Sequence, residues 1–288
     1  MVAMQINLQQ VTADYQAGPI RSPEILKSIS TTIKSGSFTA VVGKTGSGKS
    51  SLLKLMNGLL VPVKGQVSIG EIMITSENAK QSVKEARRKV GMVFQFPESQ
   101  LFAETVEKDI MFGPMNFGVP KAEAKEIALE VIERVGLDAT ILSKSPFALS
   151  GGQKRYVAMA GILAMRPDIL VLDEPGAGLD PKGKKEVMDL LHAWHKERGL
   201  TTLLVTHDMD DVALYADEVI VMDEGRIVFQ DEPERLFSEM TAIHQWGLEL
   251  PQARKLQIRI EQEANVRLPR ICLTLDKLAD ALIEAGLA

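Results

Sequence analysis

The sequence lacks most features that mark secreted, membrane-spanning or nucleic-acid-binding proteins. It contains a single cysteine, Cys272, so no disulfide can form within the chain, which fits a reducing compartment. We expect Cys272 to be a small buried apolar residue. No apolar run approaches the roughly 20 residues that a helix needs to span a bilayer, and the first ten residues show neither the basic start nor the apolar core of a secretory signal. The net charge is −5 with no long basic block, so nucleic acid is a poor candidate for a partner.

What remains is the composition of an ordinary soluble globular protein. The 288 residues suffice for one large domain, or for one domain with an appendage, and show no tandem repeat. Short β-prone runs such as Phe38–Val42 and Gly65–Thr75 alternate with helical patterns such as Lys121–Val135, which predicts a mainly parallel sheet covered by helices. Two β-rich arms about Glu224–Gly225 predict a hairpin, and residues 231–288 have a mostly helical pattern that we interpret as an appendage.

The first motif is the segment Val41–Ser50, VVGKTGSGKS, which holds three glycines, two lysines and three hydroxyl side chains behind a short apolar run. The spacing of Gly43, Gly48, Lys49 and Ser50 between a buried strand and a helix start is that of a phosphate-binding loop. Backbone N–H groups and the helix dipole favour an anion there. Lys49 adds a charge toward the outer phosphates, and the Ser50 hydroxyl is placed for a magnesium ion. We predict nucleotide contacts from Gly43, Lys44, Thr45, Gly46, Ser47, Gly48, Lys49 and Ser50.

A second anion-binding pattern is LSGGQ at Leu149–Gln153, directly before a helical stretch at Lys154–Met165. The N–H groups of a helix start, together with a hydroxyl, suit an anion. A globular domain rarely needs two such sites for one ligand. We predict ligand contacts from Ser150, Gly151, Gly152 and Gln153.

The third pattern is ILVLDEP at Ile169–Pro175, a buried strand that ends in two acids. In open α/β sheets, ligands bind at the carboxyl edge, where such acids lie. Asp173 is suited to hold magnesium through water, and Glu174 to activate the attacking water as general base. Two acids that merely cap a loop are the alternative.

In this order and spacing, the three motifs resemble the Walker A, signature and Walker B motifs of ABC-type ATPases, over residues 4 to 230. The resemblance implies an α/β fold with a P-loop NTPase (RecA-like) core and a mainly parallel sheet. It also implies N-terminal antiparallel strands, a helical signature subdomain at about 97–165 and a helical C-terminal appendage. The nucleotide-binding domain would comprise residues 1–230 and the appendage residues 231–288.

The resemblance assigns roles to four further residues. Tyr15 matches the aromatic that stacks on adenine, and Gln95 matches the Q-loop glutamine that contacts magnesium and the water. Asp180 matches the D-loop, and His207 matches the switch histidine that contacts the γ-phosphate. The implied catalytic set is Glu174, His207 and Gln95, and the implied magnesium ligands are Ser50, Gln95 and Asp173. Gly176 departs from the pattern, because threonine is frequent there.

Within that family, Val90–Pro120 and Gly247–Gln252 (GLELPQ) resemble the ATPases of energy-coupling factor (ECF) transporters, which import vitamins and transition-metal ions. This resemblance implies ATP and Mg²⁺ as cofactors and a peripheral location on the cytoplasmic face of the cell membrane. The implied partners are a second ATPase chain, identical or different, a transmembrane coupling protein and a separate substrate-binding membrane protein.

Three other functions compete with this one. One is the ATPase of a conventional ABC importer. A soluble ABC-type ATPase acting on DNA or ribosomes is disfavoured because each motif occurs once and no long coiled-coil insertion is present. A small-molecule kinase with a P-loop would leave LSGGQ and His207 unexplained.

Two surfaces are also predicted. We expect the membrane partner to dock on Gln95–Val119, because five of the nine phenylalanines fall between residues 94 and 117. We expect His192 and His195 to lie on a solvated helix face without a metal. The expected docking residues are Phe94, Phe96, Phe102, Phe112 and Phe117 with Met111 and Met115, rimmed by Glu98, Glu104, Glu107 and Asp109.

Overall fold

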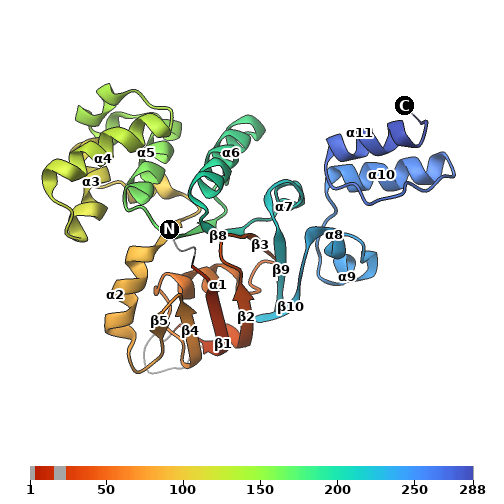
Figure 1. Cartoon of the computed structure of the whole chain (residues 1–288), viewed down its shortest axis with the longest axis horizontal. Coiled ribbons are helices and arrows are strands. Elements are labelled where there is room, and N and C mark those ends of the chain that lie inside the picture. The colour runs from red at the N-terminus through yellow and green to blue at the C-terminus, as the bar shows by residue number, and fades with distance from the viewer. Residues whose placement is uncertain (1–3, 16–23, 288) are drawn as a thin grey trace.

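The computed structural model describes residues 4–15 and 24–287, which form two β-sheets, several covering helices and a helical C-terminal extension (Figure 1). The larger sheet has the order β10-β9-β3-β8-β7-β6, and neighbouring strands run parallel except for β10, which pairs antiparallel with β9. Its central strands β3 and β8 are fully buried and mainly apolar, as expected for a sheet covered on both faces. The strands are β3 (Phe38–Val42), β6 (Val90–Val93), β7 (Ile169–Asp173), β8 (Thr201–Val205), β9 (Glu218–Asp223) and β10 (Arg226–Asp231).

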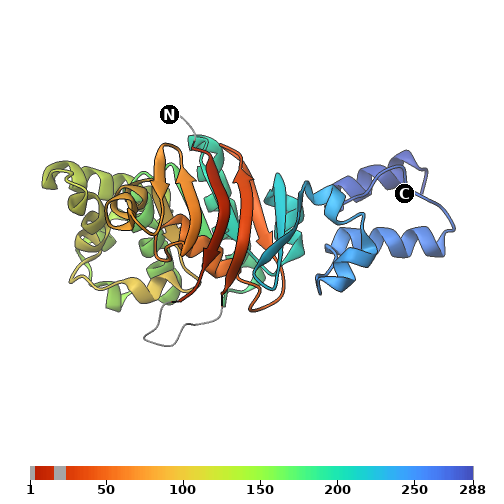
Figure 2. The same ribbon diagram turned by 90° about the horizontal axis from the view of Figure 1, so that it is seen from below.

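The smaller sheet is antiparallel, with the order β2-β1-β4-β5, and Figure 2 shows its long strands in the middle of the molecule. The prediction of a single strand over Gly65–Thr75 is wrong, because a turn at Gly70 divides this segment into the two strands of a hairpin. Gly70 has a φ of 56°, a left-handed conformation that reverses the chain. The strands are β1 (Ile6–Ala13), β2 (Leu26–Ile33), β4 (Lys64–Ile69) and β5 (Ile72–Ile74).

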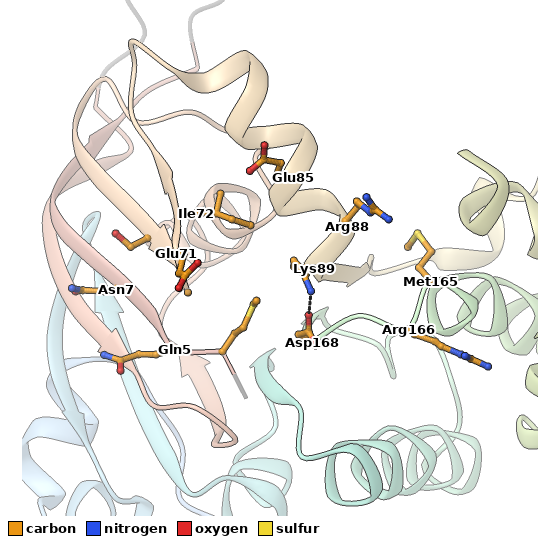
Figure 3. A pocket seen from close by; sticks show the side chains of 13 residues that line it. Gln5, Asn7, Glu71, Ile72, Glu85, Arg88, Lys89, Met165, Arg166 and Asp168 are labelled. Carbon is orange, nitrogen blue, oxygen red and sulfur yellow. Dashed lines mark hydrogen bonds and ion pairs between the residues drawn. The ribbon is translucent and has the colours of Figure 1, made fainter. Parts of the chain in front are cut away.

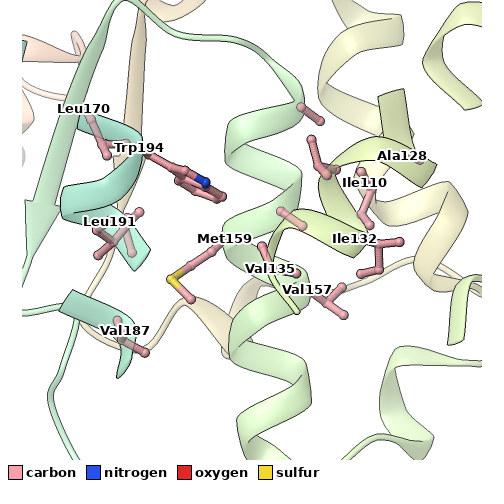
Figure 4. Close-up of a cluster of buried hydrophobic side chains, with 14 of the residues drawn as sticks. Ile110, Ala128, Ile132, Val135, Val157, Met159, Leu170, Val187, Leu191 and Trp194 are labelled. Atoms are coloured by element: carbon pink, nitrogen blue, oxygen red, sulfur yellow. The ribbon is translucent and has the colours of Figure 1, made fainter. Parts of the chain in front are cut away.

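A group of helices lies beside the parallel sheet and shares a core with it. Met159 and Val157 of α5 belong to the same buried cluster as Ile110, Ile132 and Trp194 (Figure 4). This cluster fixes the helical layer against the sheet. The helices of this group are α3 (Val106–Asn116), α4 (Lys121–Arg134), α5 (Gly151–Ala164) and α6 (Pro181–Arg198), with short 3₁₀ turns at Pro97–Gln100, Ala139–Ser143 and Pro146–Ala148. Helix α2 (Ala79–Lys89) instead packs on β5 and β6.

The C-terminal extension has two parts. Leu236, Phe237 and Ile243 pack with Met209 and Val212 of α7, so the first part adds to the core of the main body. The second part forms a small cluster of its own that includes Cys272, which is fully buried as expected. No helix within the described ranges is both long and apolar enough to cross a membrane. The helices here are α7 (Met209–Tyr215), α8 (Pro233–Leu236), α9 (Met240–Gln245), α10 (Gln252–Glu263) and α11 (Leu275–Glu284).

The predicted architecture of parallel core, antiparallel N-terminal strands, helical layer and helical extension is confirmed.

The prediction that His192 and His195 lie on a solvated face of α6 is wrong. His195 is only 2% exposed, and its Nδ1 lies 3.1 Å from the Thr202 hydroxyl. Its ring packs edge-on against Phe38 and beside His192. The face of α6 that carries them turns toward the sheet.

Acid is expected to destabilise the fold through His195. Burial lowers the pKa of His195 below its ordinary value, and the nearby Lys196 acts in the same direction. The unfolded chain therefore binds more protons than the folded chain below about pH 6.5, so the free energy of unfolding falls as the pH decreases from there. His195→Asn should reduce this fall, as measured by urea unfolding at a series of pH values. His244→Asn is the control, because His244 is exposed. An unchanged pH profile in His195→Asn would show that the buried ring is not responsible.

Candidate functional site

The register of the parallel strands brings four predicted segments to one edge of the sheet. Val41 of β3 pairs with Val205 of β8, and Val205 pairs with Asp173 of β7. The loops that follow these strands therefore leave the sheet at the same level. They carry the phosphate-binding loop, the Asp173–Glu174 pair and His207, and the adjacent β6 leads to Gln95.

The phosphate-binding loop wraps around the ammonium group of Lys49. The Nζ atom donates to the carbonyl oxygens of Gly43 at 2.7 Å and Lys44 at 2.9 Å. Burial lowers the pKa of Lys49, although Glu174 and Asp173 oppose this shift. Gly43 has a φ of 140°, and a Cβ there would lie 2.1 Å from a backbone oxygen of the neighbouring strand, so only glycine fits.

The loop also holds hydrogen-bonding groups that suit a phosphate. Helix α1 (Lys49–Met56) starts after Gly48 without a side-chain cap, so its first N–H groups are available to an anion. The hydroxyl of Ser47 is buried and has no hydrogen-bond partner in the described part of the chain. Because buried polar groups are normally paired, these features fit a bound phosphate group.

Asp173 and Ser50 form the centre of the predicted magnesium site. The Ser50 hydroxyl donates to Asp173 Oδ1 at 3.1 Å. Burial raises the pKa of Asp173, and the hydrogen bond from Ser50 partly offsets this. Oxygen donors of this kind match the preference of Mg²⁺. Across residues 4–15 and 24–287, no three His, Cys, Asp or Glu side chains gather as a metal cluster, so a magnesium ion here would also depend on phosphate oxygens and water.

Glu174 lies between two of the other predicted residues. Its Oε2 accepts a hydrogen bond from Gln95 Nε2 at 3.1 Å, and its Oε1 lies 2.8 Å from His207 Nε2. The backbone of Glu174 has a φ of 49°, a costly conformation for a residue with a side chain. Its N–H donates to Val205 O at 3.0 Å, which holds it in place. A carboxylate fixed in this way is suited to orient and deprotonate a water molecule.

Tyr15 lies beside α1. Its hydroxyl is 3.2 Å from that of Ser51 and accepts from Lys54 Nζ at 3.0 Å, while the side chain is 38% exposed. The exposed ring is accessible to a ligand next to the phosphate-binding loop. Adenine stacking on Tyr15 stays a prediction.

The signature segment does not join these residues within one chain. Ser150 and Gln153 form a reciprocal capping box at the start of α5, which packs on α3 and α4, whereas α1 packs on β4, β7 and β8. Figure 1 shows α5 in the helical layer, away from α1. Among the described residues, no hydrogen bond links Ser150–Gln153 to the phosphate-binding loop. Asp180 also points elsewhere, because its Oδ1 caps α6 by accepting from Gly183 N at 2.9 Å.

Sequence reasoning missed Arg155, a buried cation that joins the helical layer to the site. Its guanidinium forms a bidentate ion pair with Glu98, in which Nε lies 3.0 Å from Oε2 and Nη2 lies 2.9 Å from Oε1. Its Nη1 also donates to Ala177 O at 2.9 Å. A charged residue that follows LSGGQ inside a mainly apolar helix is the signal that could have identified it. Glu98, which we predicted to rim the docking surface, is instead paired with Arg155 of its own chain.

The other three predicted rim acids also have partners. Asp109 Oδ2 accepts from the backbone N–H groups of Phe102 and Ala103. Glu107 lies 3.3 Å from Lys125, and Glu104 pairs with Lys108 on the surface. In the described segment 95–119, each of the four predicted rim acids is therefore already paired within the chain. The exposed large apolar side chains of the predicted surface are Phe96, Phe102, Phe112 and Met115, whereas the predicted Met111 is buried.

A large hollow of about 1140 Å³ lies elsewhere (Figure 3). It is bordered by Lys89 and Asp168, which form an ion pair at 2.8 Å just before β6 and β7 begin. This is the amino edge of the parallel strands, opposite the edge that carries the phosphate-binding loop. The hollow is therefore not part of the candidate site.

Comparisons with known proteins agree with the site geometry. A family model described as ABC transporter matches residues 26–177. The chain is 51% identical over 279 residues to the energy-coupling factor transporter ATP-binding protein EcfA2 of Geobacillus kaustophilus, covering 97% of this chain and 96% of that protein.

Two solved structures are also similar. One is cbiO1 of Clostridium perfringens, described as part of the ABC transporter complex cbiONQ, with a TM-score of 0.71 and 35% identity over 91% of this chain and 98% of that one. The other is the ATP-binding cassette MJ0796, a dimer bound to ADP and Pi, with a TM-score of 0.69 and 30% identity over 79% of this chain and 98% of that one.

Replacing Glu174 by Gln should slow ATP hydrolysis by roughly 10²–10⁴-fold, the usual loss when a general base is removed. ATP binding should persist, because Gly43–Ser50 is unchanged. Paired turnover and nucleotide-binding assays measure the two effects. Glu186→Gln, an exposed acid on α6 paired with Lys182, is the control and should behave as the wild type. Full turnover in Glu174→Gln would assign the base to another residue.

The Glu98–Arg155 pair is expected to stabilise the fold, because Arg155 is only 4% exposed. Glu98→Lys should lower the free energy of unfolding by about 3 kcal/mol or more, since it leaves a buried cation facing another cation. Glu104→Lys is the matched control and should leave the free energy of unfolding nearly unchanged, because its pair with Lys108 is exposed. Urea unfolding compares them, and equal stability of the two variants would contradict this assignment.

Proposed function

The chain belongs to the ABC transporter family of ATPases, and we propose that it is the ATP-hydrolysing subunit that powers an ECF-type membrane importer. The observation that carries this proposal is the meeting of the phosphate-binding loop, Asp173, Glu174, Gln95 and His207 at one edge of the sheet. The likeness to the EcfA2 protein extends over nearly the whole chain, including the C-terminal extension. Conventional importer ATPases and soluble ABC-type ATPases have no comparable support.

The residues divide the work of hydrolysis. The N–H groups of the phosphate-binding loop and the ammonium of Lys49 bind the β- and γ-phosphates, and Lys49 exchanges its two carbonyl partners for phosphate oxygens. Ser50, Asp173 and Gln95 would hold Mg²⁺, which when bound neutralises charge on the phosphates. Glu174 takes a proton from the attacking water, and His207 donates a hydrogen bond toward the γ-phosphate.

A second chain completes each site in this proposal. The start of α5 is an exposed, capped helix end with Ser150, Gly151 and Gly152, and it lies apart from the phosphate-binding loop of its own chain. When two chains pair face to face, the start of α5 of one chain can meet the phosphate-binding loop of the other. Both anion-binding segments then contact the same nucleotide. The dimeric MJ0796 structure supports this arrangement. Whether the second chain is identical or different does not change the role of these residues.

The membrane partner is proposed to dock on the apolar surface formed by Phe96, Phe102, Phe112 and Met115. These side chains are between 43% and 59% exposed, and the rings of Phe102 and Phe112 pack edge-to-face at 4.8 Å. Exposed aromatic pairs are typical anchors for a partner helix. The surface follows Gln95 in sequence, so it connects the nucleotide site to the partner.

This docking places the chain on the cytoplasmic face of the membrane, bound to a transmembrane coupling protein and, through it, to a separate protein that captures a vitamin or transition-metal ion. The nucleotide-binding domain is inferred to span residues 1–230, with the extension from 231 onward. Purification of the tagged chain from its native membranes, with identification of the copurifying proteins by mass, tests the proposal. Recovery of a transmembrane protein and an ATPase chain is expected, and recovery of ribosomes or nucleic acid instead would contradict it.

The double variant Phe102→Ala/Phe112→Ala should weaken association with the membrane subunit by roughly 30-fold or more, since a single anchor aromatic contributes about 2 kcal/mol. Folding and nucleotide binding should be preserved, because both rings are exposed. Copurification and substrate uptake measure the effect. Leu129→Ala, an exposed apolar residue on α4, is the control and should assemble normally. Normal assembly and uptake by the double variant would move the docking surface elsewhere.

A further inference from the structure

Lys184 lies in the first turn of α6 and contacts three segments around the nucleotide site. Its backbone N–H donates to Asp180 O at 2.9 Å, so it stands one helical turn after Asp180. Its side chain is 24% exposed and reaches across to the loop that follows β8. Lys184 belongs to none of the motifs identified from the sequence.

The ammonium group of Lys184 joins two carboxylates. Its Nζ donates to Asp208 Oδ2 at 2.5 Å and lies 2.8 Å from Asp211 Oδ2. Burial alone would lower the pKa of Lys184, but the hydrogen bonds to Asp208 and Asp211 outweigh it and raise the pKa. Lys184 is therefore a fixed positive charge between two acids.

Both chain neighbours of His207 are tied into this network. The Thr206 hydroxyl donates to Asp211 Oδ2 at 3.1 Å and accepts from the backbone N–H of Asp208 at 3.0 Å. Asp208 Oδ1 also caps α7 by accepting from Asp210 N at 2.8 Å. The backbone on each side of His207 is thus held to α7, and through Lys184 to α6.

The aliphatic part of Lys184 packs over Gly176, two residues after Glu174. A Cβ at Gly176 would lie only 2.6 Å from Lys184 Cγ, so the absence of a side chain at 176 makes room for Lys184. A small cavity of about 160 Å³ is lined by Glu174, His207 and Lys184 among others. Lys184 therefore contacts both loops that carry the pair Glu174 and His207.

We propose that Lys184 is a positioning residue for ATP hydrolysis, which sets the place of His207 relative to Glu174 by tying α6 to the loop 206–211. This inference rests on the proposed role of His207. Without the ammonium group, Asp208 and Asp211 would face each other as like charges, and their repulsion would displace the loop. A displacement of about 1 Å at a reacting group can cost on the order of 10²-fold in rate.

The test uses the full-length chain in the complex that copurifies with it. Lys184→Met should lower kcat for ATP hydrolysis roughly 10- to 100-fold, with little change in KM, because the phosphate-binding loop is untouched. Lys185→Met is the matched control: Lys185 is the next residue, is 68% exposed and pairs with Asp189 on its own helix. Thermal unfolding and ATP binding verify that each variant is folded. A wild-type kcat in Lys184→Met overturns the inference.

A double-mutant cycle separates positioning from a general structural role. If Lys184 acts through His207, Lys184→Met should cost little in a His207→Ala background. An equal loss in both backgrounds overturns the inference. Full activity of His207→Ala alone overturns the proposed role of His207, and this inference with it.

Gly176→Ala gives an independent test that leaves all three charges in place. The added Cβ should displace Lys184 and lower kcat in the same direction. In a Lys184→Ala background, where the colliding Cγ is gone, Gly176→Ala should cause no further loss. A wild-type kcat in Gly176→Ala, or an additive loss in the double variant, overturns the inference.

Discussion

The site depends on the hydrogen-bond register between three parallel strands. Because Val41, Val205 and Asp173 lie level across β3, β8 and β7, the loops after these strands begin at the same height. A shift by one residue would turn Asp173 from the site edge toward the opposite face of the sheet. The ladder is protected by complete burial of β3 and β8. The chemistry at the edge is therefore held in place by backbone pairing and apolar packing that take no part in it.

Charged groups inside the protein connect the layers around this edge. Arg155 spans the helical layer, the segment at Glu98 and the loop after Glu174, since it bonds to Glu98 and to Ala177 O. Lys184 forms a second link, from α6 to the loop around His207. Burying such charges is unfavourable unless every one is paired. A movement of one layer relative to another would therefore break the ion pairs of Arg155 or Lys184, unless the connected segments move together.

The C-terminal extension is in direct contact with the same edge. Lys44 of the phosphate-binding loop donates to Gln245 O of α9 at 3.2 Å, and Asp210 accepts from the first N–H of α10 at 2.8 Å. The packing of Leu236 and Phe237 against α7 continues this contact into the core. The extension is thus joined to the nucleotide-binding part by shared burial as well as by these hydrogen bonds.

The sequence by itself determined the elements and the chemistry that local patterns encode. The phosphate-binding loop, the acids after β7 and the helices at Lys121–Arg134 and in the extension follow from spacing and periodicity, which depend on residues close along the chain. Only the tertiary structure decided the burial of His195 and the partners of Glu98 and Lys184. These depend on contacts between segments far apart in the sequence, such as the 57 residues between Glu98 and Arg155, which no local pattern records. It also decided that the signature segment lies apart from the phosphate-binding loop, because packing, and not motif order, sets the distance between layers.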